Sequence, residues 1–304
     1  MAFCCAIFAV ESERRNLDMS DKPYKLGAGF PQWIDGGTHE ITFIVTEDCN
    51  LRCKYCYQVN KNNDNRMNFE VAKKAIDYIL NNREIFSAKA VTWDFIGGEP
   101  LLEIDLIDKI MDYIKIQTFK MDHPWFSMNR ISFSTNGILY DNPKVQKFIA
   151  KNKMKCSFGL TIDGTKTKHD LQRVYPEGRG SYDDVVKNIP LWLKQFPFAS
   201  TKVTFGSDDL KYLKESIIHL WELGIRIVPA NVVFENAWKE GDDKIFEERL
   251  KELADYIIDN KLWDKYETTL FEDRIGTPLK DETKEKRNMN RKNIKKTIIM
   301  LLVA

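Results

Sequence analysis

Three cysteines lie close together in the stretch EDCNLRCKYCYQ, at Cys49, Cys53 and Cys56. Thiolates at this spacing can converge on one small inorganic centre from a single loop, and they favour zinc, copper(I) or iron–sulfur clusters. Structural zinc sites and electron-transfer clusters are normally closed by four protein ligands, whereas this loop offers three. A four-iron cluster on three thiolates leaves one iron open, and an open metal position is where a substrate or cofactor binds.

The other cysteines supply no clear fourth ligand. Cys156 lies far along the chain at the start of a predicted strand, where we interpret it as a small buried residue. Cys4 and Cys5 are adjacent near the N-terminus and receive no role. No second Cys-x-x-Cys and no His-x-x-x-His pair accompanies the loop, so a structural zinc site is the weaker alternative.

Composition places the chain among folded globular proteins, because hydrophobic residues make up 43% of it. The net charge of +1 gives no reason to expect a nucleic-acid partner. No apolar run reaches the roughly 18 residues that a membrane span needs. The apolar start MAFCCAIFAV lacks the basic segment of a signal peptide. We therefore expect a cytoplasmic protein with reduced cysteines.

A short β-rich run is followed by a helical pattern six times along the chain. Alternating strands and helices predict a parallel sheet with right-handed crossovers. Periodicity leaves open whether the six units form an incomplete barrel or an open doubly wound sheet. The predicted strand–helix pairs are 41–46 with 67–82, 90–98 with 103–119, 130–137 with 142–152, 156–164 with 181–196, 201–207 with 208–224, and 225–235 with 242–263.

The polar and glycine-rich clusters all follow predicted strands. The cysteine loop follows the first strand, and Gly97-Gly98-Glu99-Pro100 ends the second. The third and fourth strands end in 134–137 (STNG) and 161–164 (TIDG). In both candidate architectures the carboxyl ends of parallel strands carry the functional site, so these clusters should meet at one rim.

With these landmarks in order, the chain resembles the radical S-adenosylmethionine (SAM) enzymes. The resemblance rests on the Cys49-x3-Cys53-x2-Cys56 motif, on the aromatic Tyr55 before its last cysteine, and on the following GGEP segment. It implies a partial (β/α)6 TIM-like barrel with outer helices, a [4Fe–4S] cluster and SAM as cofactors. In such enzymes one electron from the cluster cleaves SAM to methionine and a 5′-deoxyadenosyl radical, which abstracts a substrate hydrogen.

The resemblance also implies which residues contact SAM. Gly97 and Gly98 would let the backbone approach a ligand closely, and Glu99 would accept a hydrogen bond from the SAM ammonium. Tyr55 would shield the cluster and pack against adenine. We make no assignment of a catalytic residue.

Further contacts are expected from the third and fourth strand ends. Ser134 and Asn136 suit the ribose hydroxyls or the SAM carboxylate, although Asn-Gly is also a common turn pair. The stretch LTIDGTKTKHDLQR, residues 160–173, resembles a segment of radical SAM enzymes that modify peptides and proteins. On that basis Thr161 and Arg173 are expected to contact the SAM carboxylate.

The resemblance runs from about Ile41 to about Lys261 and suggests three regions. These are an N-terminal extension at 1–35, a radical SAM core at 36–263, and a basic, then apolar, truncated or aberrant tail at 264–304. The branch that it resembles carries further clusters in a C-terminal (SPASM) domain. That domain begins with a cysteine-rich motif, and here no cysteine follows Cys156.

The branch implies a function in maturation of ribosomally made peptides. The implied partners are a peptide or protein substrate and a one-electron donor such as flavodoxin or ferredoxin, with no nucleic acid and no membrane. Sulfatase maturation or a small-molecule radical SAM reaction is the alternative within enzymes. A non-catalytic fragment or scaffold with a cysteine-bound structural metal is the alternative outside them.

Overall fold

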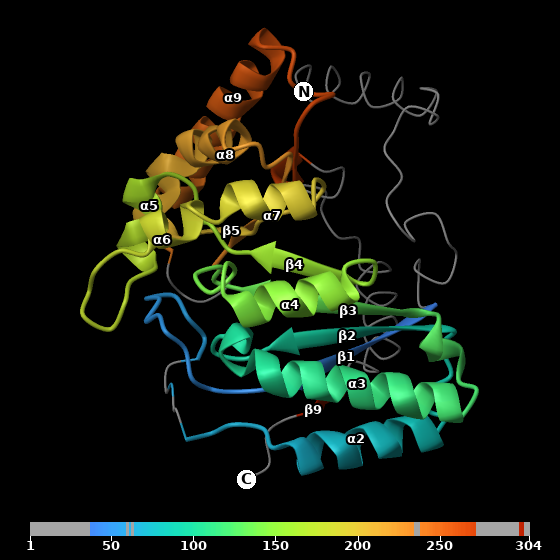
Figure 1. The fold of residues 1–304 in the computed structure, drawn as a ribbon. Coiled ribbons are helices and arrows are strands. Elements are labelled where there is room, and N and C mark those ends of the chain that lie inside the picture. Colours follow the sequence, from blue (N-terminus) through green and yellow to red (C-terminus); the bar gives the residue numbers. More distant parts are fainter. Residues whose placement is uncertain (1–36, 59–60, 62–63, 234–237, 272–297, 301–304) are drawn as a thin grey trace.

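The computed structural model describes residues 37–58, 61, 64–233, 238–271 and 298–300. Its main sheet contains four parallel strands that are consecutive in the chain: β1 (Thr38–Ile44), β2 (Ala90–Ile96), β3 (Asn129–Thr135) and β4 (Cys156–Leu160). Figure 1 shows them side by side in the order β4-β3-β2-β1, with the short parallel strand β9 (Ile298–Met300) outside β1. The parallel α/β class expected from the sequence is confirmed.

Two shorter pairs of parallel strands continue the chain. β5 (Val203–Phe205) pairs with β7 (Ala230–Val232), and β6 (Ile227–Val228) pairs with β8 (Glu267–Thr268). The sequence predicts one strand at 225–235, but Pro229 lies between β6 and β7 and has no backbone N–H to donate to a ladder. The strand is therefore divided in two.

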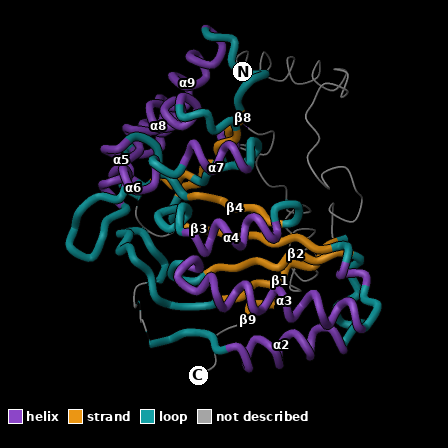
Figure 2. The backbone as a smooth tube through the Cα atoms, in the orientation of Figure 1, coloured by secondary structure: helices purple, strands orange, loops and turns teal. Residues whose placement is uncertain are grey.

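Helices cover one face of the main sheet (Figure 2). The helices on this face are α2 (Phe69–Asn81), α3 (Ile104–Lys120) and α4 (Pro143–Asn152). Their ends lie within two residues of the ends predicted from the sequence. The remaining helices lie beside the shorter strands: α5 (Lys166–Gln172), α6 (Tyr182–Val186), α7 (Ile189–Gln195), α8 (Leu213–Glu222) and α9 (Asp242–Asp259). Four short 3-10 helices are η3 (Pro100–Glu103), η4 (Pro124–Phe126), η5 (Ser207–Tyr212) and η6 (Thr269–Phe271), among the described residues.

Proline also explains a difference among the helices. The sequence predicts a single helix at 181–196, whereas the structure has α6 and α7, with Pro190 in the first turn of α7. Proline is favoured in a first helical turn and disrupts a helix interior. The predicted helix at 208–224 begins instead as η5, and α5 was not predicted as a helix.

A row of stacked phenylalanines fixes the register of the main sheet. Phe43, Phe95, Phe133 and Phe158 are direct cross-strand neighbours, with ring centroids 4.3–5.5 Å apart. Phe148 of α4 packs edge-on against Phe133, so this row faces the helices. Successive strand residues point to opposite faces, and a slip by one residue would expose the whole row.

The residues that immediately precede these phenylalanines point to the opposite face of the sheet and are polar. There Thr42, Asp94 and Ser132 are cross-strand neighbours, and the Thr42 hydroxyl lies 3.4 Å from an Asp94 carboxylate oxygen.

None of the helices in the described part of the chain has both the length and the apolar composition that a bilayer crossing requires.

The described residues reach only part of the predicted terminal regions. The predicted N-terminal extension lies outside them. Of the predicted tail, 264–271 contains β8, η6 and the buried Leu270, while 272–297 and 301–304 lie outside. The three-region division of the chain stays a prediction.

Candidate functional site

The cysteine loop leaves the end of β1 and runs along the GGEP segment that leaves β2. Backbone hydrogen bonds join Gly98 N–H to the Thr46 carbonyl at 2.8 Å and Glu99 N–H to the Asp48 carbonyl at 2.8 Å. The residues just before Cys49 are therefore held by the second strand end. The two landmarks that the sequence places at one rim are in direct contact.

Close packing explains the two glycines of this segment. A Cβ atom on Gly97 would lie 2.4 Å from the Thr46 carbonyl oxygen, and one on Gly98 would lie 2.1 Å from that of Asp48. Both obstacles are backbone atoms, which cannot rotate away. From the sequence, these glycines are predicted to let the backbone approach a ligand. In the structure the group that approaches them is the cysteine loop itself, and a ligand contact stays a prediction.

Glu99 joins the second strand end to the third. Its side chain is 1% exposed and accepts hydrogen bonds from the Thr135 hydroxyl at 2.6 Å, from Asn136 N–H at 2.8 Å and from Leu101 N–H at 3.0 Å. Burial raises the pKa of Glu99, and these donors oppose the shift. A carboxylate offers about four acceptor positions, so one remains for a ligand such as the expected ammonium.

Asn136 connects that rim to the first cysteine. Its buried amide Nδ2 donates to the Asn50 side-chain oxygen at 2.6 Å and lies 3.9 Å from the Cys49 sulfur. The Leu51 backbone N–H also points to this sulfur, at 3.4 Å. Cys49 therefore sits among hydrogen-bond donors suited to a thiolate.

The other side of the cysteine loop is attached to the last residue of α5 and to the segment that follows it. Arg52 N–H donates to the Val174 carbonyl at 2.7 Å, and Lys54 N–H donates to the Gln172 carbonyl at 2.8 Å. Between these carbonyls lies Arg173, one of the predicted SAM contacts. The loop is thus fixed on both sides, by the second strand end and by the segment after the fourth.

Tyr55 of the cysteine loop contacts two buried charged residues on this side of the loop. Its hydroxyl donates to an Asp163 carboxylate oxygen at 2.5 Å and accepts from Nη1 of Arg173 at 2.6 Å. Arg173 is 7% exposed, and its buried Nε has no hydrogen-bond partner among the described residues. An unpartnered buried guanidinium N–H fits an anionic group such as the carboxylate of SAM.

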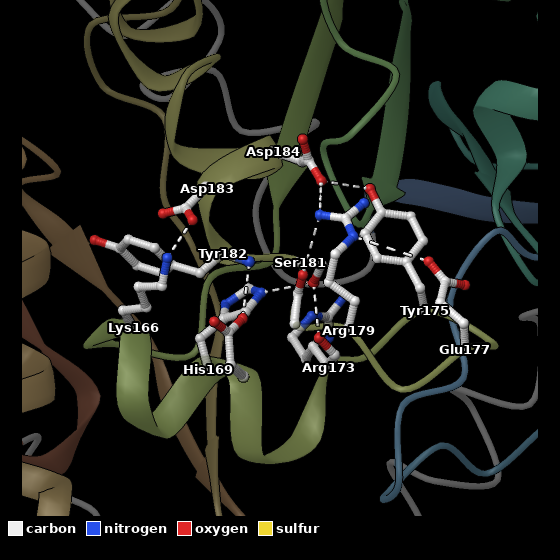
Figure 3. A network of polar contacts seen from close by, with 12 residues as sticks. Lys166, His169, Arg173, Tyr175, Glu177, Arg179, Ser181, Tyr182, Asp183 and Asp184 are labelled. Carbon is white, nitrogen blue, oxygen red and sulfur yellow. Dashed lines mark hydrogen bonds and ion pairs between the residues drawn. The ribbon is translucent and has the colours of Figure 1, made fainter.

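Figure 3 shows how the backbone of Arg173 is held in place. The His169 Nδ1 accepts from Asp163 N–H at 3.2 Å, so the ring carries its proton on Nε2, which lies 3.0 Å from the Ser181 hydroxyl. Ser181 in turn donates to the Arg173 carbonyl at 2.8 Å. Burial lowers the pKa of His169 to about 3, so the ring is neutral. In the structure His169 therefore positions the Arg173 backbone through Ser181.

The donor set of the loop fits an iron–sulfur cluster. Cys49 is buried, and Cys53 and Cys56 are half-buried. Burial raises the pKa of Cys49 and Cys53, while Lys61 acts in the opposite direction on both and Arg173 does so on Cys53. No group of three His, Cys, Asp or Glu side chains in the described residues is arranged around a single ion. A cluster takes each thiolate on a different iron, so its ligands need not converge on one point.

Two further predicted residues lie at the same rim. Ser134 is exposed on β3, on the face opposite Phe133, and Thr161 is half-buried just beyond β4, with its N–H bonded to the Thr135 carbonyl at 3.0 Å. Neither side chain belongs to the hydrogen-bonded set around the cysteines as described above. Their contact with SAM stays a prediction.

Two residues that hold the site together were not predicted from the sequence. Thr135 anchors Glu99, and its position on the same face of β3 as Ile131 and Phe133 could have indicated a buried hydroxyl. Lys168 is fully buried beneath the site, and no signal in the charged stretch GTKTKHD separates it from the exposed Lys166.

Comparison with known proteins places the chain in a family. The profile of the Radical SAM superfamily matches residues 43–217. An uncharacterized protein of Methanocaldococcus jannaschii is 36% identical over 197 residues, which are 64% of this chain and 62% of that protein. The cysteine-type anaerobic sulfatase-maturating enzyme of Clostridium novyi is 29% identical over 150 residues, which are 48% of this chain and 38% of the enzyme.

The fold agrees with a solved structure of the same kind. The structure of anSMEcpe with bound AdoMet and the Cp18Cys peptide aligns with a TM-score of 0.61 at 22% identity, over 76% of this chain and 62% of that one. The parallel sheet with outer helices is therefore the expected partial barrel. The chain spans less than two thirds of each of these proteins. The match over 43–217, with the three-cysteine loop at the rim of the sheet, shows that the chain belongs to the radical SAM superfamily, an enzyme class whose cofactors are a [4Fe–4S] cluster and SAM.

Proposed function

We propose that this chain is the core of a radical SAM enzyme that modifies a ribosomally made peptide. The observation that carries the proposal is the cysteine loop held between the end of the second strand and the end of α5. Beside it lies the Nε of Arg173, which has no hydrogen-bond partner among the described residues. Cys49, Cys53 and Cys56 would hold the cluster and leave one iron for SAM. Arg173 would bind the SAM carboxylate, and Glu99 would accept from its ammonium.

When bound, the cluster and SAM would supply the radical chemistry that removes a hydrogen atom from the substrate. The chain's own residues orient these groups and limit access of water. Asn136 and the Leu51 N–H donate toward the Cys49 sulfur, and Tyr55 and Asp163 hold Arg173 in position. A one-electron donor such as flavodoxin or ferredoxin would reduce the cluster.

Anaerobic reconstitution with iron and sulfide tests the core of this proposal. We expect one four-iron cluster per chain and reductive cleavage of SAM to 5′-deoxyadenosine. Alanine at Cys49, Cys53 or Cys56 should abolish both, and Cys156→Ala should retain both, because Cys156 lies at the start of β4, away from the rim. SAM cleavage by the triple alanine variant would contradict the proposal. One zinc per chain without sulfide would favour a scaffold.

The peptide substrate is supported by two of the similar proteins. anSMEcpe is seen with a peptide, and the Clostridium novyi relative is named as a sulfatase-maturating enzyme. The second of these also favours sulfatase maturation as an alternative function. Mass spectrometry of precursor peptides and sulfatase-derived peptides, incubated with the reconstituted chain and SAM, would separate the two. Modification of neither, with a small molecule modified instead, would contradict the peptide substrate.

A further inference from the structure

Lys168 is a lysine with no exposed surface, which is rare unless the ammonium is paired. Its Nζ donates to the Thr204 carbonyl at 2.6 Å, lies 3.6 Å from an Asp209 carboxylate oxygen and stands 4.5 Å above the ring of Phe205. These groups belong to β5 and η5, whereas Lys168 belongs to α5. The side chain therefore extends from the helix under the site into the neighbouring strand.

Thr204 links this ammonium to the cysteine loop. Its carbonyl accepts from Lys168, and its N–H donates to an Asp163 carboxylate oxygen at 3.2 Å. The second oxygen of Asp163 accepts from the hydroxyl of Tyr55. A continuous path of hydrogen bonds thus runs from Lys168 to the residue between Cys53 and Cys56.

The charges of the buried side chains also connect Lys168 with Asp163. Asp163 is fully buried, which favours its neutral form, yet its pKa lies below the usual value, mainly because Lys168 and then Arg173 stabilise the carboxylate. The buried set contains two cations, Lys168 and Arg173, and two carboxylates, Asp163 and Asp209. Removal of the Lys168 charge would leave two carboxylates with one guanidinium. This is unfavourable because one buried negative charge would then lack a compensating cation.

We propose that Lys168 is a positioning residue for the cysteine loop. Its ammonium keeps Asp163 charged and fixed, and Asp163 holds the Tyr55 hydroxyl and, through it, Cys53 and Cys56. The importance of this arrangement for catalysis rests on the proposed function. The arrangement itself is a property of the apoprotein and is tested there.

The test is the alkylation rate of individual cysteines in the reduced apoprotein with iodoacetamide, followed by peptide mass spectrometry. In Lys168→Met we expect Cys53 and Cys56 to react about tenfold faster than in the wild type, equivalent to ~1.4 kcal/mol of lost loop anchoring. Cys156, buried at the start of β4, serves as the internal standard for global opening. Lys166→Met is the matched control, because Lys166 is an exposed lysine on the same helix, paired with Asp183 (Figure 3).

Two further variants separate positioning from general stability. If Lys168 acts through the Tyr55 hydroxyl, Tyr55→Phe should accelerate the same cysteines, and Lys168→Met should add little in that background. Asp209→Asn should partly reverse the effect of Lys168→Met, because it restores one carboxylate to one guanidinium. Three outcomes would overturn the proposal: unchanged rates in Lys168→Met, additive effects with Tyr55→Phe, or an equal rise at Cys156.

These measurements need neither iron nor SAM. If the apoprotein behaves as expected but the reconstituted chain never cleaves SAM, the positioning role is retained and the proposed function is refuted. A chain that cleaves SAM while Lys168→Met leaves the cysteine rates unchanged would refute only the positioning role.

Discussion

The side-chain amide of Asn136 lies 3.9 Å from the sulfur of Cys49, although the two residues are on loops that follow different strands. The same amide bonds the Asn50 side chain, and Asn136 N–H bonds Glu99. One residue of the third strand end therefore contacts both the cysteine loop and the GGEP segment. The amide supplies an N–H···S contact at Cys49, the first of the three predicted cluster ligands.

This contact predicts an effect on the reduction potential. Hydrogen bonds to the sulfurs of a cluster favour its reduced, more negative state. Loss of one such bond in Asn136→Ala should lower the potential of the reconstituted cluster by about 40 mV, if the bond contributes ~1 kcal/mol to a one-electron couple. A redox titration followed by electron paramagnetic resonance measures this. Asn81→Ala, at an exposed position on α2, should leave the potential unchanged, and an unchanged potential in Asn136→Ala would contradict the role.

Gly98 should be intolerant of any side chain. Gly98→Ala would place a Cβ 2.1 Å from the Asp48 carbonyl oxygen, so the cysteine loop must move. We expect the free energy of unfolding to fall by about 3 kcal/mol, the upper end for overpacking, and iron incorporation to fall with it. Urea titration and iron analysis measure the two effects.

Gly159→Ala is the matched control for that substitution. A Cβ on Gly159 would lie 3.5 Å from the nearest atom outside its neighbours, an ordinary contact, so stability should change little. Equal losses for the two glycines would show that the close approach at Gly98 is not what matters.

The residues of the cysteine loop and of the motifs at the strand ends were easier to predict from the sequence than the residues that hold them in place. Cysteine spacing and the order of landmarks along the chain are local properties, and Cys49, Glu99 and Asn136 could be selected from them. The hydrogen bond from Thr135 to Glu99 and the burial of Lys168 depend on how strands and helices pack against one another. These tertiary contacts have no local pattern in a single sequence.

The same distinction holds for the fold. Strand–helix alternation predicted the four parallel strands of the main sheet, because buried parallel strands and amphipathic helices have strong local patterns. The division of elements at Pro190 and Pro229 was missed, although the effect of proline on backbone hydrogen bonding could have indicated both.

His169 should make the stability of the protein depend on pH. Its pKa is about 3 in the folded protein because it is buried, against 6.5 when exposed, so below pH 6.5 the unfolded chain binds the extra proton. The stability that His169 contributes is complete above pH 6.5 and is lost as pH falls toward 3. From pH 7 to pH 5 the wild type should lose about 2 kcal/mol of unfolding free energy through this residue.

The variant His169→Gln isolates that contribution. It loses the titrating ring, so the difference in unfolding free energy between wild type and variant should shrink by about 2 kcal/mol over the same pH range. Urea titrations at several pH values measure the difference. His123, whose pKa is also lowered by burial, to about 4, contributes equally to both proteins and cancels. A difference independent of pH would show that His169 is not buried in its neutral form.

Asp94 should have the opposite pH dependence. It lies on the polar face of the sheet, 9% exposed, and its pKa is raised from 3.8 to about 6, chiefly by burial and further by Glu40, against hydrogen bonds from Ser132 and Thr42. The folded protein therefore favours the protonated acid, and this stability is complete below pH 3.8 and is lost as pH rises through 6.

The variant Asp94→Asn removes that penalty. Relative to it, the wild type should lose about 1.4 kcal/mol of unfolding free energy between pH 5 and pH 8. The loss follows because burial destabilises the ionised carboxylate more than the hydroxyl groups of Ser132 and Thr42 stabilise it. Asp243→Asn, at an exposed position in the first turn of α9, controls for the removal of one acid. A wild type that loses no stability over this range, relative to Asp94→Asn, would mean that the carboxylate is solvated or paired with a cation in the folded protein.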